Sequence, residues 1–334
     1  MRRVTQMFCT IFHIHEPNDT TRWTRRRQRL CFDYDLYTRA TLQRKDDSHL
    51  LQDLIRRSVA TVRRQFLPHY RLSPPRWRVL IRRLSWRRAL PDFCVVGPGR
   101  SGTSDIAVTL MSHPNVLCPL VKEIVSGDPI SWTPFYPTVQ AVRRHARRHG
   151  VALCPYIAPN IHRFDVPIAL AKLRPETKIV INLRNPVDLA FSTWKWFVLH
   201  MDRSSLRNDP SLAIFSAFVD KALEVFPAPI SPFYFVLHSG IYWSSVQQWL
   251  RCFRDDHVVV FDISEYFTDR RNYMERVERF LGLPHVPLHH DLPIAHRNPL
   301  ELPAPQAETR EKLRAFFQPY NRRLWDVIHT EYSW

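Results

Sequence analysis

The sequence predicts an α/β fold of three layers, in which a central parallel sheet lies between two layers of helices. Three short apolar runs, at residues 92–96, 178–183 and 257–261, are each followed by a segment whose apolar residues recur at helical spacing. Nearly continuous apolar runs are typical of strands that are buried on both faces. Strands that alternate with helices pair in parallel, so these runs are expected to lie in one sheet.

The remaining elements are short and are separated by proline or glycine. A further strand is expected at residues 116–118, and helices at residues 135–149, 166–173, 211–226, 241–253, 273–281 and 307–329. Another helix is expected to begin near Val187, with Pro186 in its first turn. Gly282 follows the helix at 273–281. Proline at the start and glycine after the end are favoured helix positions.

Charge divides the chain into two parts. The 334 residues carry 48 Lys and Arg against 31 Asp and Glu, for a net charge of +17. Residues 1–91 hold 21 of these basic residues and 7 of the acidic ones, which leaves 27 and 24 for the rest. We therefore assign residues 1–90 to a basic N-terminal extension, partly helical or disordered, and residues 91–334 to the main domain.

The extension contains a basic amphipathic segment. Apolar residues recur at helical spacing over residues 50–66, with arginines between them, and a second arginine-rich pattern covers residues 68–88. Such a segment suits contact with nucleic acid or with an anionic membrane. The alternative is a solvated helix face that packs on the main domain.

The cysteines and the hydropathy indicate an intracellular protein. Six cysteines are scattered without a CxxC pair, and four lie in apolar surroundings. This is typical of buried thiols in a reducing compartment and indicates neither a zinc site nor a disulfide framework. No apolar run reaches the length of a membrane span, and no convincing signal peptide is present. We expect a cytoplasmic protein without a metal ion.

A glycine-rich loop follows the first predicted strand. Gly97, Gly99 and Gly102 are three of only seven glycines in the chain. A loop of this kind, placed before a helix, presents backbone N–H groups and the positive end of the helix dipole to an anion. A phosphate-like ligand is the first hypothesis, and a tight strand-to-helix turn without a ligand is the alternative.

Three interpretations of this loop compete. A nucleoside triphosphatase requires lysine after the last glycine, where this chain has Thr103. An NAD(P)-dependent oxidoreductase of the Rossmann type requires the G-x-G-x-x-G spacing, which is present, and an acidic residue about 20 positions further on, where Glu123 lies. The third interpretation is a sulfuryl donor site, because four anion-binding side chains crowd the loop: Arg100, Ser101, Thr103 and Ser104.

At this point the sequence resembles the sulfotransferases that use 3′-phosphoadenosine-5′-phosphosulfate (PAPS). The loop is similar to the 5′-phosphosulfate loop of that family, through Gly97-Pro98-Gly99-Arg100-Ser101-Gly102-Thr103-Ser104. The strand at residues 179–183 with the following Arg184-Asn185-Pro186 and Ser192 is similar to the family's 3′-phosphate motif. Residues 239–250 and 277–284 are similar as well, so the resemblance covers residues 91–330.

The resemblance implies a P-loop NTPase-like sulfotransferase fold and a set of donor-binding residues. These are Gly99, Arg100, Ser101, Gly102, Thr103 and Ser104 in the loop, then Arg184 and Ser192 for the 3′-phosphate. Arg297, within His296-Arg297-Asn298, is expected in a late loop that closes on the donor. The product would be 3′-phosphoadenosine-5′-phosphate.

The resemblance also implies the chemistry of sulfation. A sulfuryl group would move in line from PAPS to a hydroxyl or amine, with Glu123 as base and Arg100 stabilising charge. His113 and Asp128 are weaker candidates for the base. Carbohydrate is favoured as acceptor over tyrosine, lipid or a small molecule, because several aromatic residues could stack on sugars, although such residues more often belong to the core: Trp132, Tyr136, Trp194, Trp196 and Trp243. A non-catalytic anion-binding or nucleic-acid-binding protein on the same fold is the remaining alternative.

Overall fold

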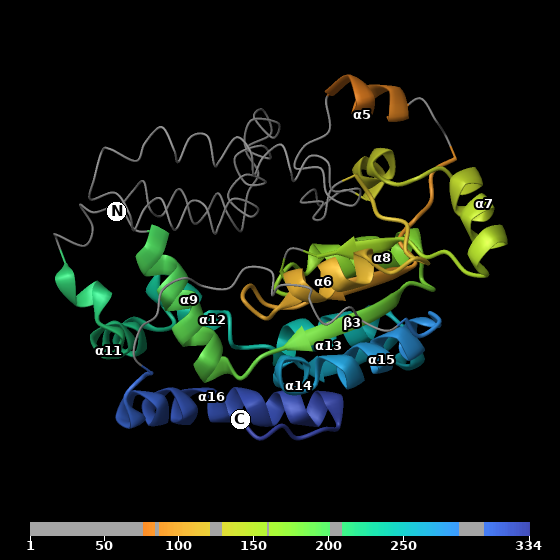
Figure 1. The fold of residues 1–334 in the computed structure, drawn as a ribbon. Helices are drawn as coiled ribbons and strands as arrows, with labels where there is room; N and C mark the ends of the chain where they lie inside the picture. The colour runs from red at the N-terminus through yellow and green to blue at the C-terminus, as the bar shows by residue number, and fades with distance from the viewer. Residues whose placement is uncertain (1–75, 84–86, 121–128, 159, 201–208, 287–303) are drawn as a thin grey trace, which may run out of the picture.

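The computed structural model describes residues 76–83, 87–120, 129–158, 160–200, 209–286 and 304–334. These residues form a sheet of four parallel strands in the order β2-β1-β3-β4 (Figure 1). The strands are β1 Phe93–Val96, β2 Pro155–Ile157, β3 Lys178–Leu183 and β4 Val258–Asp262. Three of the four match the predicted apolar runs.

Helices cover both faces of the sheet and form a further group beyond the end of β3. The α-helices are α5 Arg76–Arg83, α6 Thr103–Met111, α7 Val139–His149, α8 Asp165–Leu173, α9 Pro186–His200, α11 Phe215–Val225, α12 Phe233–His238, α13 Trp243–Cys252, α14 Ile263–Thr268, α15 Arg270–Leu281 and α16 Ala307–Ile328. Short 3-10 helices are η2 Pro129–Phe135, η3 Pro210–Ala213 and η4 Asp255–His257.

Successive side chains of a strand point to opposite faces of the sheet, so the core is divided into two clusters, one on each face. Cys94 and Val96 of β1 join a core cluster with residues of α8, α13 and α16. Phe93 and Val95 point to the opposite face and join a cluster with residues of α6 and α15. Because strands with both faces covered must be apolar throughout, this packing explains the continuous apolar runs in the sequence. The predicted three-layer α/β architecture is confirmed.

A third core cluster lies among helices rather than on the sheet. It joins buried residues of α9, α11, α12 and α16, among them Trp194, Phe218 and Phe317. In Figure 1, α9 rises from the end of β3, and α16 runs along the lower side of the molecule to the C-terminus. This cluster anchors α9, so the helix that follows β3 is fixed along its length.

Strand order places the two predicted ligand motifs beside each other. The connection after β1 leads toward β2, whereas the connection after β3 leads toward β4, on the other side. In open α/β sheets, ligands bind at the carboxyl ends of adjacent strands whose connections diverge in this way. That position lies between β1 and β3, where the glycine loop and Arg184 both begin.

The strand predicted at residues 116–118 was wrong, and β2 was missed. Val116 makes only an isolated bridge to Leu153. Pro119 follows shortly after and has no N–H with which to extend a ladder. The edge strand is instead β2 Pro155–Ile157, whose three residues are too few to show a periodic pattern.

The end of the basic extension contacts the main domain. The Arg82 guanidinium of α5 donates to backbone carbonyls of Pro134 and Tyr136, at and just after the end of η2. Arg88 pairs with Thr138 in an isolated antiparallel bridge. The amphipathic segment at residues 50–66 lies outside the described residues. None of the helices that the structure describes is long and apolar enough to cross a lipid bilayer.

The glycine loop supplies a test of this packing. A Cβ atom added to Gly97 would lie 2.4 Å from the Asn182 carbonyl oxygen and 2.5 Å from Ser101 Oγ, whereas one added to Gly99 meets nothing within 4 Å. Gly97→Ala is therefore expected to lower the free energy of unfolding by about 1–3 kcal/mol, and the matched control Gly99→Ala by less than about 0.5 kcal/mol. Urea denaturation measures both, and equal losses would contradict the observed loop geometry.

Candidate active site

The loop between β1 and α6 has a backbone suited to an anion. Arg100 and Gly102 have φ angles of 72° and 71°, so the residues on both sides of Ser101 lie in the left-handed region. Turns of this type point successive N–H groups toward one concavity. Gly102 is also the N-cap of α6, and no side chain caps that helix. The loop and the first turn of α6 therefore present backbone donors and the positive end of a dipole.

The loop side chains differ in what they contact. Ser101 is fully buried, and its hydroxyl donates to the Pro98 carbonyl at 2.7 Å, which closes the turn. Thr103 and Ser104 form the first turn of α6 and are half-buried. Gly99 has open space beside it. The contribution of each residue to donor binding stays a prediction.

Arg184 reaches this loop from the end of β3. Its Nη1 donates to the Arg100 carbonyl oxygen at 2.8 Å, across 84 positions of sequence. The backbone at Arg184 is itself held, because the buried Tyr242 hydroxyl donates to the Arg184 carbonyl at 2.8 Å. Asn185 Oδ1 accepts from the Val187 N–H at 2.9 Å and so starts α9 beside Pro186. The two motifs that the sequence singled out are therefore in contact.

Charges of both signs act on Arg184. Burial lowers the pKa of Arg184, and the nearby Arg100 lowers it further, while Asp188, Tyr242 and Asp262 act in the opposite direction. Asp188 nevertheless pairs with Arg310 of α16 at 3.0 Å. No carboxylate forms an ion pair with Arg184 in the part of the chain that the structure describes. An anionic ligand would supply the compensating charge.

The acidic residue closest in sequence to the loop also has partners outside the loop. Asp105, in the first turn of α6, is buried and accepts from the Tyr266 hydroxyl. It also forms an ion pair with Arg270 at 3.4 Å, and Arg270 donates to Thr109 at 2.8 Å. These contacts fasten α6 to α14 and α15. They also offset the carboxylate charge that would otherwise repel an anion at the loop.

Comparisons with known proteins now decide the family. Residues 90–292 match the family model described as the sulfotransferase domain. The chain belongs to the sulfotransferase family. This confirms the resemblance and decides against the oxidoreductase interpretation of the glycine spacing, for which Glu123 would have been the ribose-binding acid.

Two kinds of curated relative share this domain. The human bifunctional heparan sulfate N-deacetylase/N-sulfotransferase 3 is 27% identical over 217 residues, which cover 59% of this chain but only 23% of that protein. Human heparan sulfate glucosamine 3-O-sulfotransferase 6 is 23% identical over 273 residues, which cover 74% of this chain and 75% of that protein. This sulfotransferase thus spans less than a quarter of the first relative's length.

A solved structure supports the fold. The sulfotransferase from Alicyclobacillus acidocaldarius aligns with a TM-score of 0.50 and 24% identity, over 73% of this chain and 98% of that one. At this level of identity the likeness concerns the fold alone. Together with the parallel sheet, it confirms the sulfotransferase-type α/β fold.

Several predicted residues of the sulfotransferase lie outside the described residues. They are Glu123, Asp128 and Arg297, so the base and the late donor contact remain predictions. His113 is described and buried, and both of its ring nitrogens have backbone partners. Nε2 lies 2.9 Å from the Pro284 carbonyl oxygen, and Nδ1 lies 3.0 Å from the Asn115 N–H. His113 therefore ties the end of α6 to residue 284 and has no ring nitrogen left to act as a base.

Three of the five aromatic residues considered as sugar contacts belong to the core, which was the alternative role. Trp132, Tyr136 and Trp194 are at most 3% exposed. Trp132 stacks on Tyr156 at 4.3 Å between ring centroids, and the Trp194 indole donates to the Leu212 carbonyl. The other two, Trp196 and Trp243, are half-buried against the core clusters. Periodic aromatic residues in these helices build the core.

The described cysteines are free thiols. Cys94 and Cys154 are buried, and Cys118 and Cys252 are half-buried. Burial raises the pKa of each of them, to about 12 for Cys118. They are therefore protonated and unreactive at neutral pH. Among the described residues, no group of three His, Cys, Asp or Glu side chains is arranged to hold a metal ion.

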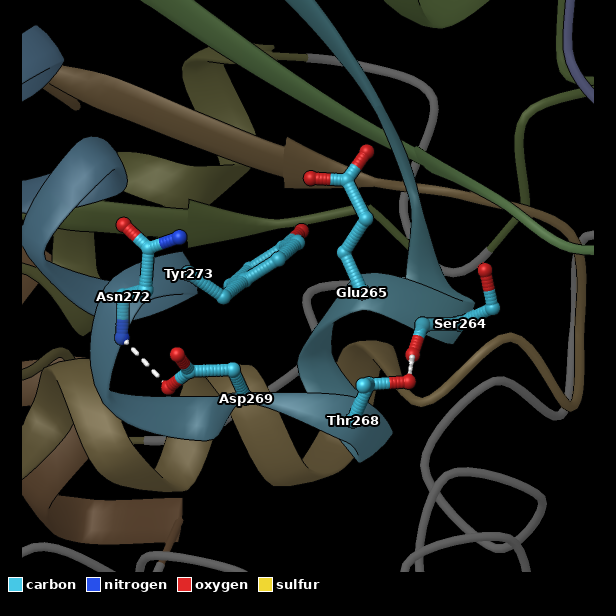
Figure 2. A pocket seen from close by; sticks show the side chains of 6 residues that line it. All are labelled: Ser264, Glu265, Thr268, Asp269, Asn272 and Tyr273. Carbon is cyan, nitrogen blue, oxygen red and sulfur yellow. Dashed lines mark hydrogen bonds between the residues drawn. The ribbon is translucent and has the colours of Figure 1, made fainter.

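One hollow of the described surface lies away from the glycine loop. It has a volume of about 280 Å³ and lies between α14 and the start of α15 (Figure 2). Its lining includes two carboxylates, Glu265 and Asp269, and Figure 2 shows Glu265 extending away from Asp269. Glu265 pairs with Arg276, and Asp269 caps α15. Acidic side chains would repel a phosphate or sulfate group, so this hollow does not suit the donor.

Sequence reasoning missed a histidine behind the glycine loop. The backbone N–H of Ile161 donates to the Gly97 carbonyl at 3.1 Å, and the next residue is His162. His162 Nε2 lies 3.1 Å from the Ser239 carbonyl, so it must carry the proton, and Nδ1 accepts from the Ser245 hydroxyl at 2.9 Å. Burial, together with the neighbouring His238, lowers the pKa of His162 to about 4. A single histidine between short elements carries no sequence signal for this role.

His162 makes the stability of the fold depend on pH. Its pKa is about 4 when folded and near the ordinary 6.5 when unfolded, so the unfolded chain binds the proton more tightly. Stability is full above pH 6.5 and falls as the pH drops toward 4. At pH 5, protonation of His162 in the unfolded chain should therefore lower the free energy of unfolding by about 2 kcal/mol relative to pH 7.

Urea denaturation of the wild type and of His162→Gln at both pH values measures this effect. Between pH 7 and pH 5, the free energy of unfolding of the variant should fall by about 2 kcal/mol less than that of the wild type. An identical pH dependence in the two proteins would show that His162 is not held neutral.

Proposed function

We propose that this sulfotransferase moves a sulfuryl group from PAPS to a carbohydrate hydroxyl or amine. The observation that carries the proposal is the contact of Arg184 with the Arg100 carbonyl, which brings both anion-binding motifs to one point at the sheet edge. PAPS has an anionic group for each motif, a phosphosulfate and a phosphate monoester. The crowded Gly97, the uncapped α6 and an arginine without an ion pair among the described residues suit such a ligand.

In this proposal, different residues bind the two anionic groups of the donor. The backbone from Gly99 to Ser104, with Arg100, holds the phosphosulfate. Arg184 and Ser192 hold the 3′-phosphate, since Ser192 lies on α9 two turns beyond Pro186. Arg297 adds a contact from the late loop. Preorganised donors of this kind stabilise the charge that develops on the transferred group and on the leaving phosphate.

Glu123 would act as the base. The carboxylate accepts the proton from the acceptor O–H or N–H while the acceptor atom forms a bond to sulfur. The bond between sulfur and the bridging phosphate oxygen breaks, and 3′-phosphoadenosine-5′-phosphate leaves with that electron pair. A positioned base contributes about 10²- to 10⁴-fold to such a step.

The relatives support a carbohydrate acceptor. By name they act on heparan sulfate, one group as N-sulfotransferases and another as 3-O-sulfotransferases of glucosamine. Both acceptor atoms, an amine nitrogen and a hydroxyl oxygen, fit the same chemistry. A panel of amino sugars, their N-acetylated forms and uronic-acid-containing oligosaccharides, assayed with PAPS, distinguishes N- from O-sulfation.

Donor binding provides a direct test. Adenosine 3′,5′-bisphosphate at about 100 times its Kd should raise the melting temperature by about 5–10 °C. Arg184→Ala should weaken its binding at least 10-fold, because a charge-assisted contact is lost. The matched control is Arg254→Ala, since Arg254 is exposed and pairs only with Asp256 among the described residues. Stabilisation by NADH or ATP, but not by the bisphosphate, would refute the proposal.

The base is tested separately. Glu123→Gln keeps the size of the side chain but cannot accept the proton, so kcat should fall by about 10²- to 10⁴-fold while the Kd of the bisphosphate stays the same. Glu224→Gln is the control, because Glu224 is exposed and pairs with Lys221. Full activity of Glu123→Gln would rule out this base. Donor binding without turnover of any acceptor would instead favour the non-catalytic alternative.

A further inference from the structure

A lysine of α9 faces the donor region and was not anticipated from any motif. Lys195 follows Ser192 by three positions, so the two side chains lie on neighbouring parts of one helix face. Lys195 is half-buried, and its Nζ lies 4.7 Å from the centroid of the Phe191 ring, one turn closer to the sheet. The amine is thus directed back along α9 toward its N-terminal end, where Arg184 lies.

The charged side chains that act on Lys195, among the described residues, are two arginines. Burial lowers the pKa of Lys195, and Arg184 and then Arg100 lower it further. No ion pair of Lys195 is present in the described part of the molecule. The acid on the same helix face, Asp188, pairs with Arg310 instead. Lys195 and Arg184 therefore repel one another, and neither forms an ion pair among the described residues, an arrangement that an anion bound between them would stabilise.

The expected ligand has more charge than one arginine can balance. A phosphate monoester carries a charge of about −1.5 to −2 at neutral pH, whereas each group of a phosphosulfate carries about −1. Arg184 supplies one positive charge in a planar geometry that suits two phosphate oxygens. A second cation is needed to balance the monoester, and lysine serves as a mobile point charge.

We propose that Lys195, together with Arg184, binds the 3′-phosphate monoester of the donor and so selects 3′-phosphorylated nucleotides over those that lack this group. This inference rests on the proposed function and deepens it. It assigns a specificity-determining role to a residue of α9 whose distance from the glycine loop in sequence exceeds 90 positions.

The test compares two nucleotides that differ only in the 3′-phosphate. Binding of adenosine 3′,5′-bisphosphate and of adenosine 5′-monophosphate is measured by calorimetry with the full chain and with Lys195→Met. The variant should bind the bisphosphate about 10- to 100-fold more weakly, the size of a charge-assisted contact, and the monophosphate within about threefold of the wild type. Lys195→Arg should recover most of the selectivity, because it restores the charge.

The control variant removes a lysine of another helix. Lys221→Met removes an exposed lysine of α11 that pairs with Glu224, and it should leave both affinities as in the wild type. Bisphosphate binding within twofold of the wild type in Lys195→Met would overturn the inference alone. Equal weakening of both nucleotides would also overturn it, since the lysine would then act on the 5′ side or on the fold. A wild-type protein that does not prefer the bisphosphate would overturn the proposed function and this inference together.

Discussion

The hydrogen bond from Arg184 to the Arg100 carbonyl oxygen is the interaction on which the proposed donor site depends. It joins the loop after β1 to the end of β3, at the edge where the connections of these strands diverge. The bond has a backbone acceptor, so it positions the guanidinium without neutralising it. Arg184 therefore keeps its full charge for a ligand while its direction is set by the fold.

The surrounding structure supports this contact from behind. Tyr242 donates to the Arg184 carbonyl, and the adjacent Gly240 leaves no room for a side chain, because a Cβ atom there would lie 2.8 Å from Phe317 and 2.9 Å from Pro186. His162 holds the carbonyl of Ser239 in the same bend. The segment at residues 239–250, which resembled the family, thus packs against the start of α9 and supports Arg184 from behind.

The distribution of acidic residues is as important as that of the basic ones. Asp188 and Asp105 lie within one turn of the two motifs. Each is paired with an arginine of a C-terminal helix, Arg310 or Arg270, which offsets part of its negative charge. Removing one of these arginines would free a carboxylate beside the proposed donor site, so we expect residues of α16 and α15 to influence anion binding there.

The sequence by itself determined the sheet strands β1, β3 and β4, the two anion motifs and the family, because each depends on residues close together in the chain. Continuous apolar runs and a dense group of glycines are local signals. Only the tertiary structure decided that β2 replaces the strand at residues 116–118, that Trp132 is core, and that His113 is tied to residue 284. It also decided which carboxylates are already paired and that Lys195 faces the arginines. These properties depend on contacts between residues far apart in sequence, and no local pattern records them.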